Sequence, residues 1–177
     1  MPTSVATVWF ENRLGEEPYR HRQDGDTLRI EAEHFTDQRD GTWYKQSRYA
    51  GFSGDGYAQD HNSQAATPRA WADTRGMTYA IEVSGGTYAV WLRRLIPTQW
   101  GRALGGERSN SVWLGADDQP PAAPVDDVAA PTEQWAWVRA GSLALSRGRH
   151  TLTLKTREGG YAVDQILLTT DPDSAPM

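Results

Sequence analysis

Short runs of alternating polar and apolar residues, separated by glycine-rich turns, limit the fold of this chain more than any other feature. Residues 79–83 alternate, Ser-Gly-Gly follows at 84–86, and a second run covers residues 87–96. Successive side chains of a strand point to opposite faces, so these runs predict two strands, and the turn predicts that they form a hairpin. Similar runs occupy residues 27–34, 111–115, 135–139, 143–145, 150–156 and 161–169. Many short strands with almost no helix signal predict an antiparallel sandwich.

The composition excludes several classes of function for this chain. The 177 residues suit one domain, and the absence of Cys excludes a thiolate metal site and a cysteine nucleophile. A net charge of −5 argues against nucleic-acid binding through a basic field. No run approaches the ~18 apolar residues of a membrane span, so we expect no membrane partner. Eight Trp and seven Tyr against three Phe give rings with a polar edge, which suit half-wet stacking surfaces as well as cores.

Two glutamates stand one residue apart in a run with strand character. In an extended chain Glu31 and Glu33 project from the same face and repel each other, unless a cation lies between them. Ca²⁺ takes 6–8 oxygen ligands and suits such carboxylates. Asp164, in the last strand-like run, offers a third carboxylate in a similar setting. The alternative is that both glutamates simply face water on a solvated strand.

Arg93 and Arg94 are adjacent in the run at 87–96. In a strand they point to opposite faces, so at least one of them has to be exposed or paired. Glu82, on the expected hairpin partner, is the simplest partner for such an ion pair.

Three segments together resemble the carbohydrate-binding modules of families 6 and 35. The first is Ile-Glu-Ala-Glu-His-Phe at 30–35, and the second comprises the two runs at 79–83 and 86–93. The third is the ending, with Trp-Ala-Trp-Val at 135–138 and Val-Asp-Gln-Ile-Leu-Leu at 163–168. The resemblance implies an all-β jelly-roll sandwich of two antiparallel sheets over residues 28–170. We then expect residues 1–27 to be an N-terminal extension or an extra edge strand, and residues 171–177 to be a linker or tail.

The family implies a structural Ca²⁺. Its ligands would be the first-strand glutamates Glu31 and Glu33, the last-strand Asp164, and a backbone carbonyl near residues 48–51. This supplies the cation that the paired glutamates lack.

The family also implies a sugar site in the loops at one end of the sandwich, where two aromatic rings clamp the sugar. Trp135 matches one ring, and Tyr49, Phe52 and Tyr57 compete for the other. The hydrogen-bonding Asn of the family is replaced here by Ala162. Tyr161 or an Arg from a neighbouring loop could substitute for it.

Trp100 lies in a polar loop, residues 97–110, that strand alternation does not explain. Arg102 and Arg108 follow it in the same loop. An exposed Trp is costly to leave in water, so we expect Trp100 to bind ligand. Sixteen of the 18 basic residues are Arg, and an Arg fork suits carboxylate or sulfate. We therefore expect an acidic or sulfated glycan, stacked on loop aromatics and assisted by Arg102.

The function we expect is non-catalytic binding of a polysaccharide or oligosaccharide, which targets an attached polysaccharide-degrading enzyme to its glycan. The family implies a catalytic domain in the same parent chain and secretion with it, although residues 1–11 lack the pattern of a secretory signal. No nucleophile motif or metal-ligand spacing accompanies the four His. The alternatives are a structural accessory domain that binds no sugar, and a small polysaccharide lyase or hydrolase.

Overall fold

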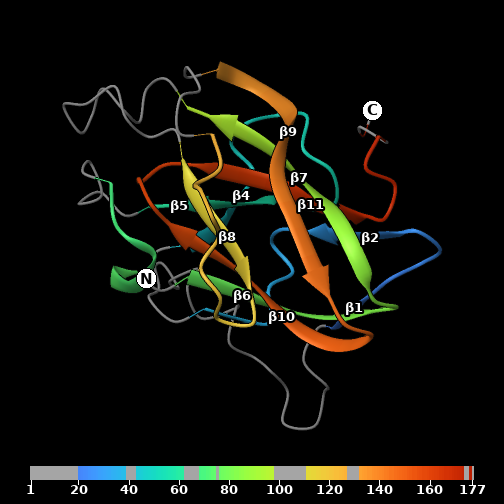
Figure 1. Ribbon diagram of the computed structural model, residues 1–177. Coiled ribbons are helices and arrows are strands. Elements are labelled where there is room, and N and C mark those ends of the chain that lie inside the picture. Colours follow the sequence, from blue (N-terminus) through green and yellow to red (C-terminus); the bar gives the residue numbers. More distant parts are fainter. Residues whose placement is uncertain are drawn as a thin grey trace, which may run out of the picture.

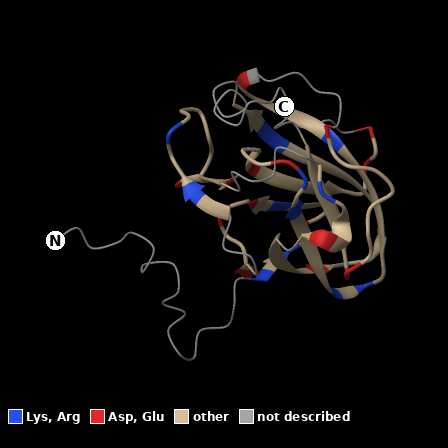
Figure 2. Cartoon of the chain, turned by 90° about the vertical axis from the view of Figure 1, so that its left-hand side faces the viewer, with Lys and Arg blue, Asp and Glu red and all other residues tan. Residues whose placement is uncertain are grey.

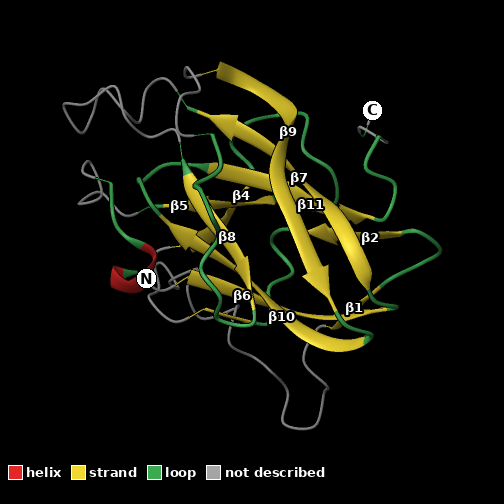
Figure 3. Cartoon of the chain, in the orientation of Figure 1, coloured by secondary structure: helices red, strands yellow, loops and turns green. Residues whose placement is uncertain are grey.

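Strands make up nearly all of the regular structure (Figure 3). The computed structural model describes residues 20–38, 43–61, 68–74, 76–97, 111–126, 132–173 and 176. The strands of this part are β1 (Arg20–Arg22), β2 (Thr27–Glu31), β3 (Asp37–Gln38), β4 (Trp43–Gln46), β5 (Tyr57–Asp60), β6 (Gly76–Val83), β7 (Gly86–Ile96), β8 (Val112–Ala116), β9 (Thr132–Leu145), β10 (Gly148–Thr156) and β11 (Ala162–Thr169). One 3-10 turn, η2 (Trp71–Asp73), accompanies them, and no helix of the described residues could cross a membrane.

The strands form two sheets packed face to face (Figure 1). The five-stranded sheet has the order β1-β6-β10-β8, and β3 also pairs with β6. The six-stranded sheet has the order β4-β5-β11-β7-β9, and β2 also pairs with β11. Pairing is antiparallel throughout except that β1 runs parallel to β6. The predicted all-β jelly roll is confirmed, with this parallel pair as its one departure among the described strands.

The predicted hairpin between β6 and β7 is wrong, because the two strands belong to different sheets. β6 pairs with β10, whereas β7 pairs with β9 and β11. Gly85 (φ +89°) lies in the crossover between the sheets, and a Cβ there would stand 2.7 Å from the backbone N of Arg147. Arg147 lies in a second crossover, from β9 to β10. Glycine at position 85 therefore lets two crossovers pack together.

Strand alternation places the core between the sheets. In β6, Met77, Tyr79, Ile81 and Val83 are buried, and the residues between them are half-buried. Each such side chain contributes roughly 1.5–3 kcal/mol when it is fully removed from water. β11 is buried along its whole length, because it lies in the middle of the six-stranded sheet.

The outer face of the six-stranded sheet carries Trp rings covered by arginines. The guanidinium of Arg29 lies 5.3 Å from the ring centroid of Trp137, and that of Arg139 lies 5.4 Å from the Trp91 ring. Basic and acidic residues are mixed along the strands (Figure 2). These arginines therefore act as aromatic covers rather than as one basic band.

Candidate functional site

The loop between β4 and β5, residues 47–56, organises the candidate site. Gly51 (φ +92°) and Gly54 (φ +59°) hold left-handed conformations that favour glycine, so the loop can fold back on itself. Its aromatic residues, Tyr49 and Phe52, contact the buried ring of Tyr57. The residues that follow Phe52 contact a group of acidic side chains. The loop therefore joins an aromatic region to an acidic one.

Three acidic side chains meet beside this loop. The backbone N–H of Ser53 donates to Asp164 Oδ1 at 2.9 Å, and its hydroxyl donates to Glu31 Oε2 at 2.5 Å. A Cβ on Gly54 would lie 3.1 Å from Glu33 Oε1 and 3.4 Å from Glu31 Oε2, so both glutamates approach the space that this glycine leaves open. The structure thus brings together all three residues predicted as metal ligands.

The backbone positions these carboxylates differently from the prediction that Glu31 and Glu33 lie on one face of a continuous strand. β2 ends at Glu31, and residues 32–33 form a turn in which the N–H of His34 donates to the Glu31 carbonyl at 3.0 Å. Glu33 therefore reaches Glu31 through a turn and not along a continuing strand. Asp164 sits where the pairing of β11 with β7 shifts register. Such an irregularity re-aims a side chain next to a functional site.

The three carboxylates differ in their partners. Glu31 Oε1 accepts a hydrogen bond from Gln165 Nε2 at 2.7 Å, and Asp164 forms an ion pair with Arg93. Both oxygens of Glu33 are buried and have no hydrogen-bond partner among the described residues. Burial is the main cause that raises the pKa of Glu33 to about 8; its own backbone N–H opposes the rise, and the nearby Asp55 and Glu31 carboxyls add to it.

The expected ion pair between one of the two adjacent arginines and Glu82 is wrong. Arg93 pairs with Asp164, while Arg94 Nε donates to Asp126 Oδ2 at 2.5 Å on the core side. Glu82 instead lies 3.6 Å from Arg22 on the edge strand β1. The two guanidiniums do point to opposite faces, as expected for neighbours in a strand.

A fourth acidic residue completes the cluster at its exposed rim. Ligand atoms of Glu33, His34 and Asp55 lie within 4.8 Å of one another. Asp55 also forms an ion pair with Lys45, and the hydrogen bond from Lys45 is the main cause that lowers the pKa of Asp55. The acidic cluster (Glu31, Glu33, Asp55 and Asp164) thus runs from the buried sheet to the surface.

These groups fit a hard cation such as Ca²⁺. A buried carboxylate without donors, next to further carboxylates, is an arrangement that a cation stabilises and that costs free energy without one. The fit is best at Glu33, because both oxygens of Asp164 already accept from Arg93 and Ser53. Both oxygens of Glu31 likewise accept, from Gln165 and the Ser53 hydroxyl. In the predicted carbonyl stretch at 48–51, the carbonyl of Gly51 accepts a hydrogen bond from Arg93.

Three partly buried rings form an aromatic surface on the other side of the loop: Tyr49, Phe52 and Trp135. They pack on Tyr57, whose ring centroid lies 5.0 Å from that of Trp135 in an edge-on contact. Trp135 Nε1 donates to the Ala50 carbonyl at 3.1 Å, which fixes the plane of the ring. Partly exposed rings held on a rigid base are what stacking on a sugar requires.

Two of the predicted ligand contacts lie in the interior. Tyr57 is 0% exposed, so it supports the aromatic surface from beneath instead of facing a ligand. Tyr161 is also 0% exposed, and its hydroxyl donates to Asp126 at 2.8 Å within the core. The prediction that Tyr161 contacts ligand in place of the family Asn is therefore at odds with the structure. Trp100 and Arg102 lie outside the described residues.

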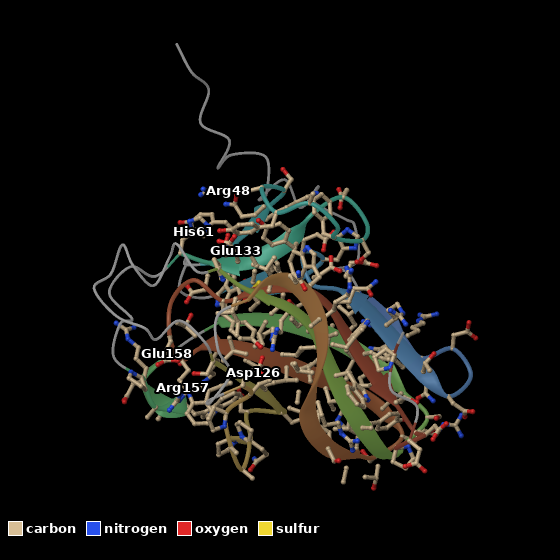
Figure 4. All side chains as sticks on the ribbon, turned by 90° about the horizontal axis from the view of Figure 1, so that it is seen from above. Arg48, His61, Asp126, Glu133, Arg157 and Glu158 are labelled. Atoms are coloured by element: carbon tan, nitrogen blue, oxygen red, sulfur yellow. The ribbon has the colours of Figure 1, made fainter. Side chains whose placement is uncertain are left out.

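Sequence reasoning did not single out two charged residues beside the aromatic surface. The guanidinium of Arg48 lies 5.7 Å from the Tyr49 ring centroid. Burial raises the pKa of Tyr49, and the charges of Arg48 and Glu133 act on it in opposite directions. Figure 4 labels Arg48 and Glu133 at the same end of the molecule. Arg48 adjoins a candidate Tyr in sequence, which was the one available signal.

Comparison with known proteins finds structural matches only. No family model and no curated protein matches the chain. The GH26-CBM35 β-(1,4)-mannanase of Podospora anserina aligns over 87% of this chain with 19% identity and a TM-score of 0.61. The chain covers 29% of that mannanase, so it spans under a third of it.

Single modules match over nearly their whole length. The CBM35 of Paenibacillus barcinonensis aligns over 83% of this chain and 100% of its own, with 20% identity and a TM-score of 0.57. A family 35 carbohydrate-binding module from Clostridium thermocellum aligns over 81% of this chain and 98% of its own, with 15% identity and a TM-score of 0.57. The resemblance to family 35 modules is thus confirmed at the level of the fold.

Proposed function

We propose that this chain is a non-catalytic carbohydrate-binding module whose ligand stacks on the aromatic surface of Tyr49, Phe52 and Trp135. The observation that carries the proposal is the packing of these three rings on the fully buried Tyr57 at one end of the sandwich. Ala162, which replaces the family Asn, is buried in the same cluster. It extends the apolar base and leaves polar contacts to groups at the rim, such as Arg48 and Glu133.

The second part of the proposal is a structural Ca²⁺ at the acidic cluster. Glu31, Glu33 and Asp164 would hold it, with Asp55 at the exposed rim. The ion would supply positive charge to Glu33, whose buried oxygens have no donor among the described residues. It would also tie the end of β2 to the loop at residues 47–56, which carries part of the aromatic surface.

The ligand class we propose is an acidic or sulfated glycan. Its support is the position of the Arg48 guanidinium over Tyr49, where a fork could reach a carboxylate or sulfate on a stacked sugar. Because such a contact is electrostatic, affinity should fall as salt rises. Equal affinity for neutral oligosaccharides at low and high salt would contradict the acidic ligand and leave sugar binding intact.

One constellation has the residue types of a hydrolase. His150 Nδ1 lies 2.6 Å from Asp117 Oδ2, and His150 Nε2 lies 3.4 Å from Ser146 Oγ. However, Nε2 lies closer, at 2.9 Å, to the backbone carbonyl of Ser146, to which it can only donate. Asp117 raises the pKa of His150, which favours the form that donates from both nitrogens. A nitrogen that donates to a carbonyl is not placed to take the proton of the Ser146 hydroxyl, which supports a non-catalytic function.

The test is a glycan array combined with an activity screen on the same polysaccharides. We expect retention without product, and we expect Trp135→Ala to weaken the retention by at least tenfold, a loss of about 1.4 kcal/mol. Trp137→Ala is the matched control, because it lies on the same strand and its ring is covered by Arg29. Product formation would indicate an enzyme, and absence of both binding and product would indicate a structural accessory domain attached to a catalytic partner.

A further inference from the structure

Arg93 lies between the acidic cluster and the aromatic surface and contacts both. Its Nη1 forms an ion pair with Asp164, which is fully buried. Its Nη2 donates to the Gly51 carbonyl at 2.9 Å. The guanidinium carbon lies 5.8 Å from the ring centroid of Trp135. One side chain thus connects a candidate cation ligand, the loop and a stacking ring.

The loop is held from both sides within four residues. Trp135 fixes the carbonyl of Ala50, and Arg93 fixes the carbonyl of Gly51. Two residues later, Ser53 donates to Glu31 and Asp164. A backbone segment of four residues, hydrogen-bonded at both ends, thus links the acidic side to the ring of Trp135.

We infer that Arg93 is a positioning residue that couples cation binding at the acidic cluster to the placement of Trp135. The inference rests on the proposed function. A cation near Asp164 competes with the Arg93 guanidinium for the same carboxylate and repels the guanidinium. The guanidinium therefore moves away from Asp164, toward Gly51 and Trp135. By linkage, a ligand on Trp135 alters the affinity for the cation by the same factor.

The positive charge of Arg93 determines whether a substitution there should raise or lower the affinity for Ca²⁺. Arg93→Gln removes the competing cation and frees Asp164, so the affinity for Ca²⁺ should rise by roughly fivefold. If Arg93 were merely a structural support, its loss would weaken Ca²⁺ binding. Arg93→Lys keeps the charge but cannot reach Asp164 and Gly51 with one rigid fork. It should therefore keep the wild-type affinity for Ca²⁺ and still lose the coupling.

The experiment uses Ca²⁺ as its probe and the full chain labelled with 5-fluorotryptophan. Trp135→Phe assigns the fluorine resonance of Trp135, and Trp113, in β8 of the other sheet, is the internal control. In the wild type the Trp135 resonance should move with the same Ca²⁺ dependence as the melting temperature, while the Trp113 resonance stays fixed. In Arg93→Gln and Arg93→Lys the melting response should persist and the Trp135 shift should disappear.

Three results would overturn the inference. A rise in melting temperature without movement of Trp135 would leave the Ca²⁺ site standing and remove the coupling. A Trp135 shift that survives in both Arg93 variants would assign the coupling to another route. No response to Ca²⁺ at all would remove the coupling together with the cation site. Retention on the glycan array is measured separately, so it reports on sugar binding in every case. If Arg93→Gln does not fold, Arg93→Lys carries the test.

Discussion

The carboxylates of Asp126 and Glu33 are both largely removed from water, but they differ in the hydrogen-bond donors that surround them. Asp126 receives the Arg94 guanidinium at 2.5 Å and the Tyr161 hydroxyl at 2.8 Å. Glu33, 3% exposed, has no donor among the described residues. A carboxylate with fixed donors is a finished structural contact, whereas one without donors is stable only when neutral or beside a cation. The contrast distinguishes a structural ion pair, at Asp126, from a candidate cation site, at Glu33.

Breaking the satisfied carboxylate should have the largest effect. Asp126→Asn keeps the shape and tolerates the left-handed backbone there (φ 64°), but it removes the negative charge beside Arg94. Because Arg94 is buried, we expect the free energy of unfolding to fall by roughly 3 kcal/mol. Denaturant unfolding measures this change.

The control replaces both partners. Arg94→Met combined with Asp126→Asn removes the buried charges together and keeps a residue that tolerates the left-handed backbone, so the double variant should be more stable than Asp126→Asn alone. A loss below about 1 kcal/mol for Asp126→Asn would mean that the pair is no stronger than a surface ion pair.

Removing the cation should have the next largest effect, at the unsatisfied carboxylate. Saturating Ca²⁺ at a hundredfold excess over Kd stabilises the folded state by about 2.7 kcal/mol. For a domain of this size, chelation with EDTA should lower the melting temperature by roughly 5–10 °C. Differential scanning calorimetry before and after readdition of Ca²⁺ measures the change.

Glu33→Ala should abolish the response to EDTA. Glu82→Gln is the matched control, since Glu82 lies on β6 and pairs with Arg22 away from the loop. In chelated protein Glu33→Gln should cost less than about 1 kcal/mol, because no donor loses its partner. A melting temperature that EDTA leaves unchanged in the wild type would count against the cation site.

The smallest effect is expected at a third carboxylate, Asp117, which is exposed and bound to His150. The hydrogen bond from His150 Nδ1 to Asp117 raises the pKa of His150 above its usual 6.5. The folded state therefore favours the imidazolium, and its contribution to stability is complete below pH 6.5 and lost as pH rises through the folded pKa. Solvent screens the pair, so the loss should stay below about 1 kcal/mol.

Unfolding curves across this pH range test the contribution of the pair. Asp117→Asn should remove most of the pH dependence, and added salt should reduce it in the wild type. Stability that increases from pH 6.5 to 8 in the wild type, but not in Asp117→Asn, would contradict the assignment.

The sequence allowed the fold class to be predicted but not all of its pairings. Alternation in residues 79–83 identified β6, because one face of that strand is apolar. It could not show that β6 and β7 belong to different sheets, since the crossover depends on contacts with Arg147, far along the chain. Periodicity defines the faces of a strand and does not define its neighbour.

The candidate site was predictable in the same partial way. Glu31, Glu33 and Asp164 were identified by charge within strand-like runs, and the structure places them together. The roles of Arg93 and Ser53 were not visible, because their partners lie far away in sequence. Tyr161 illustrates the remaining difficulty: an aromatic ring at the end of a strand can face the core or a ligand, and only the three-dimensional packing decides.

The position of β11 has a consequence for how the chain reaches this fold. β11 comes last in the sequence yet lies in the interior of the six-stranded sheet, between β7 on one side and β2 and β5 on the other. Until it is synthesised, the early strands of that sheet have no central partner. Most pairings must then close long loops, which slows folding to the range of milliseconds to seconds. On the ribosome, this sheet can therefore assemble only after nearly the whole domain has emerged.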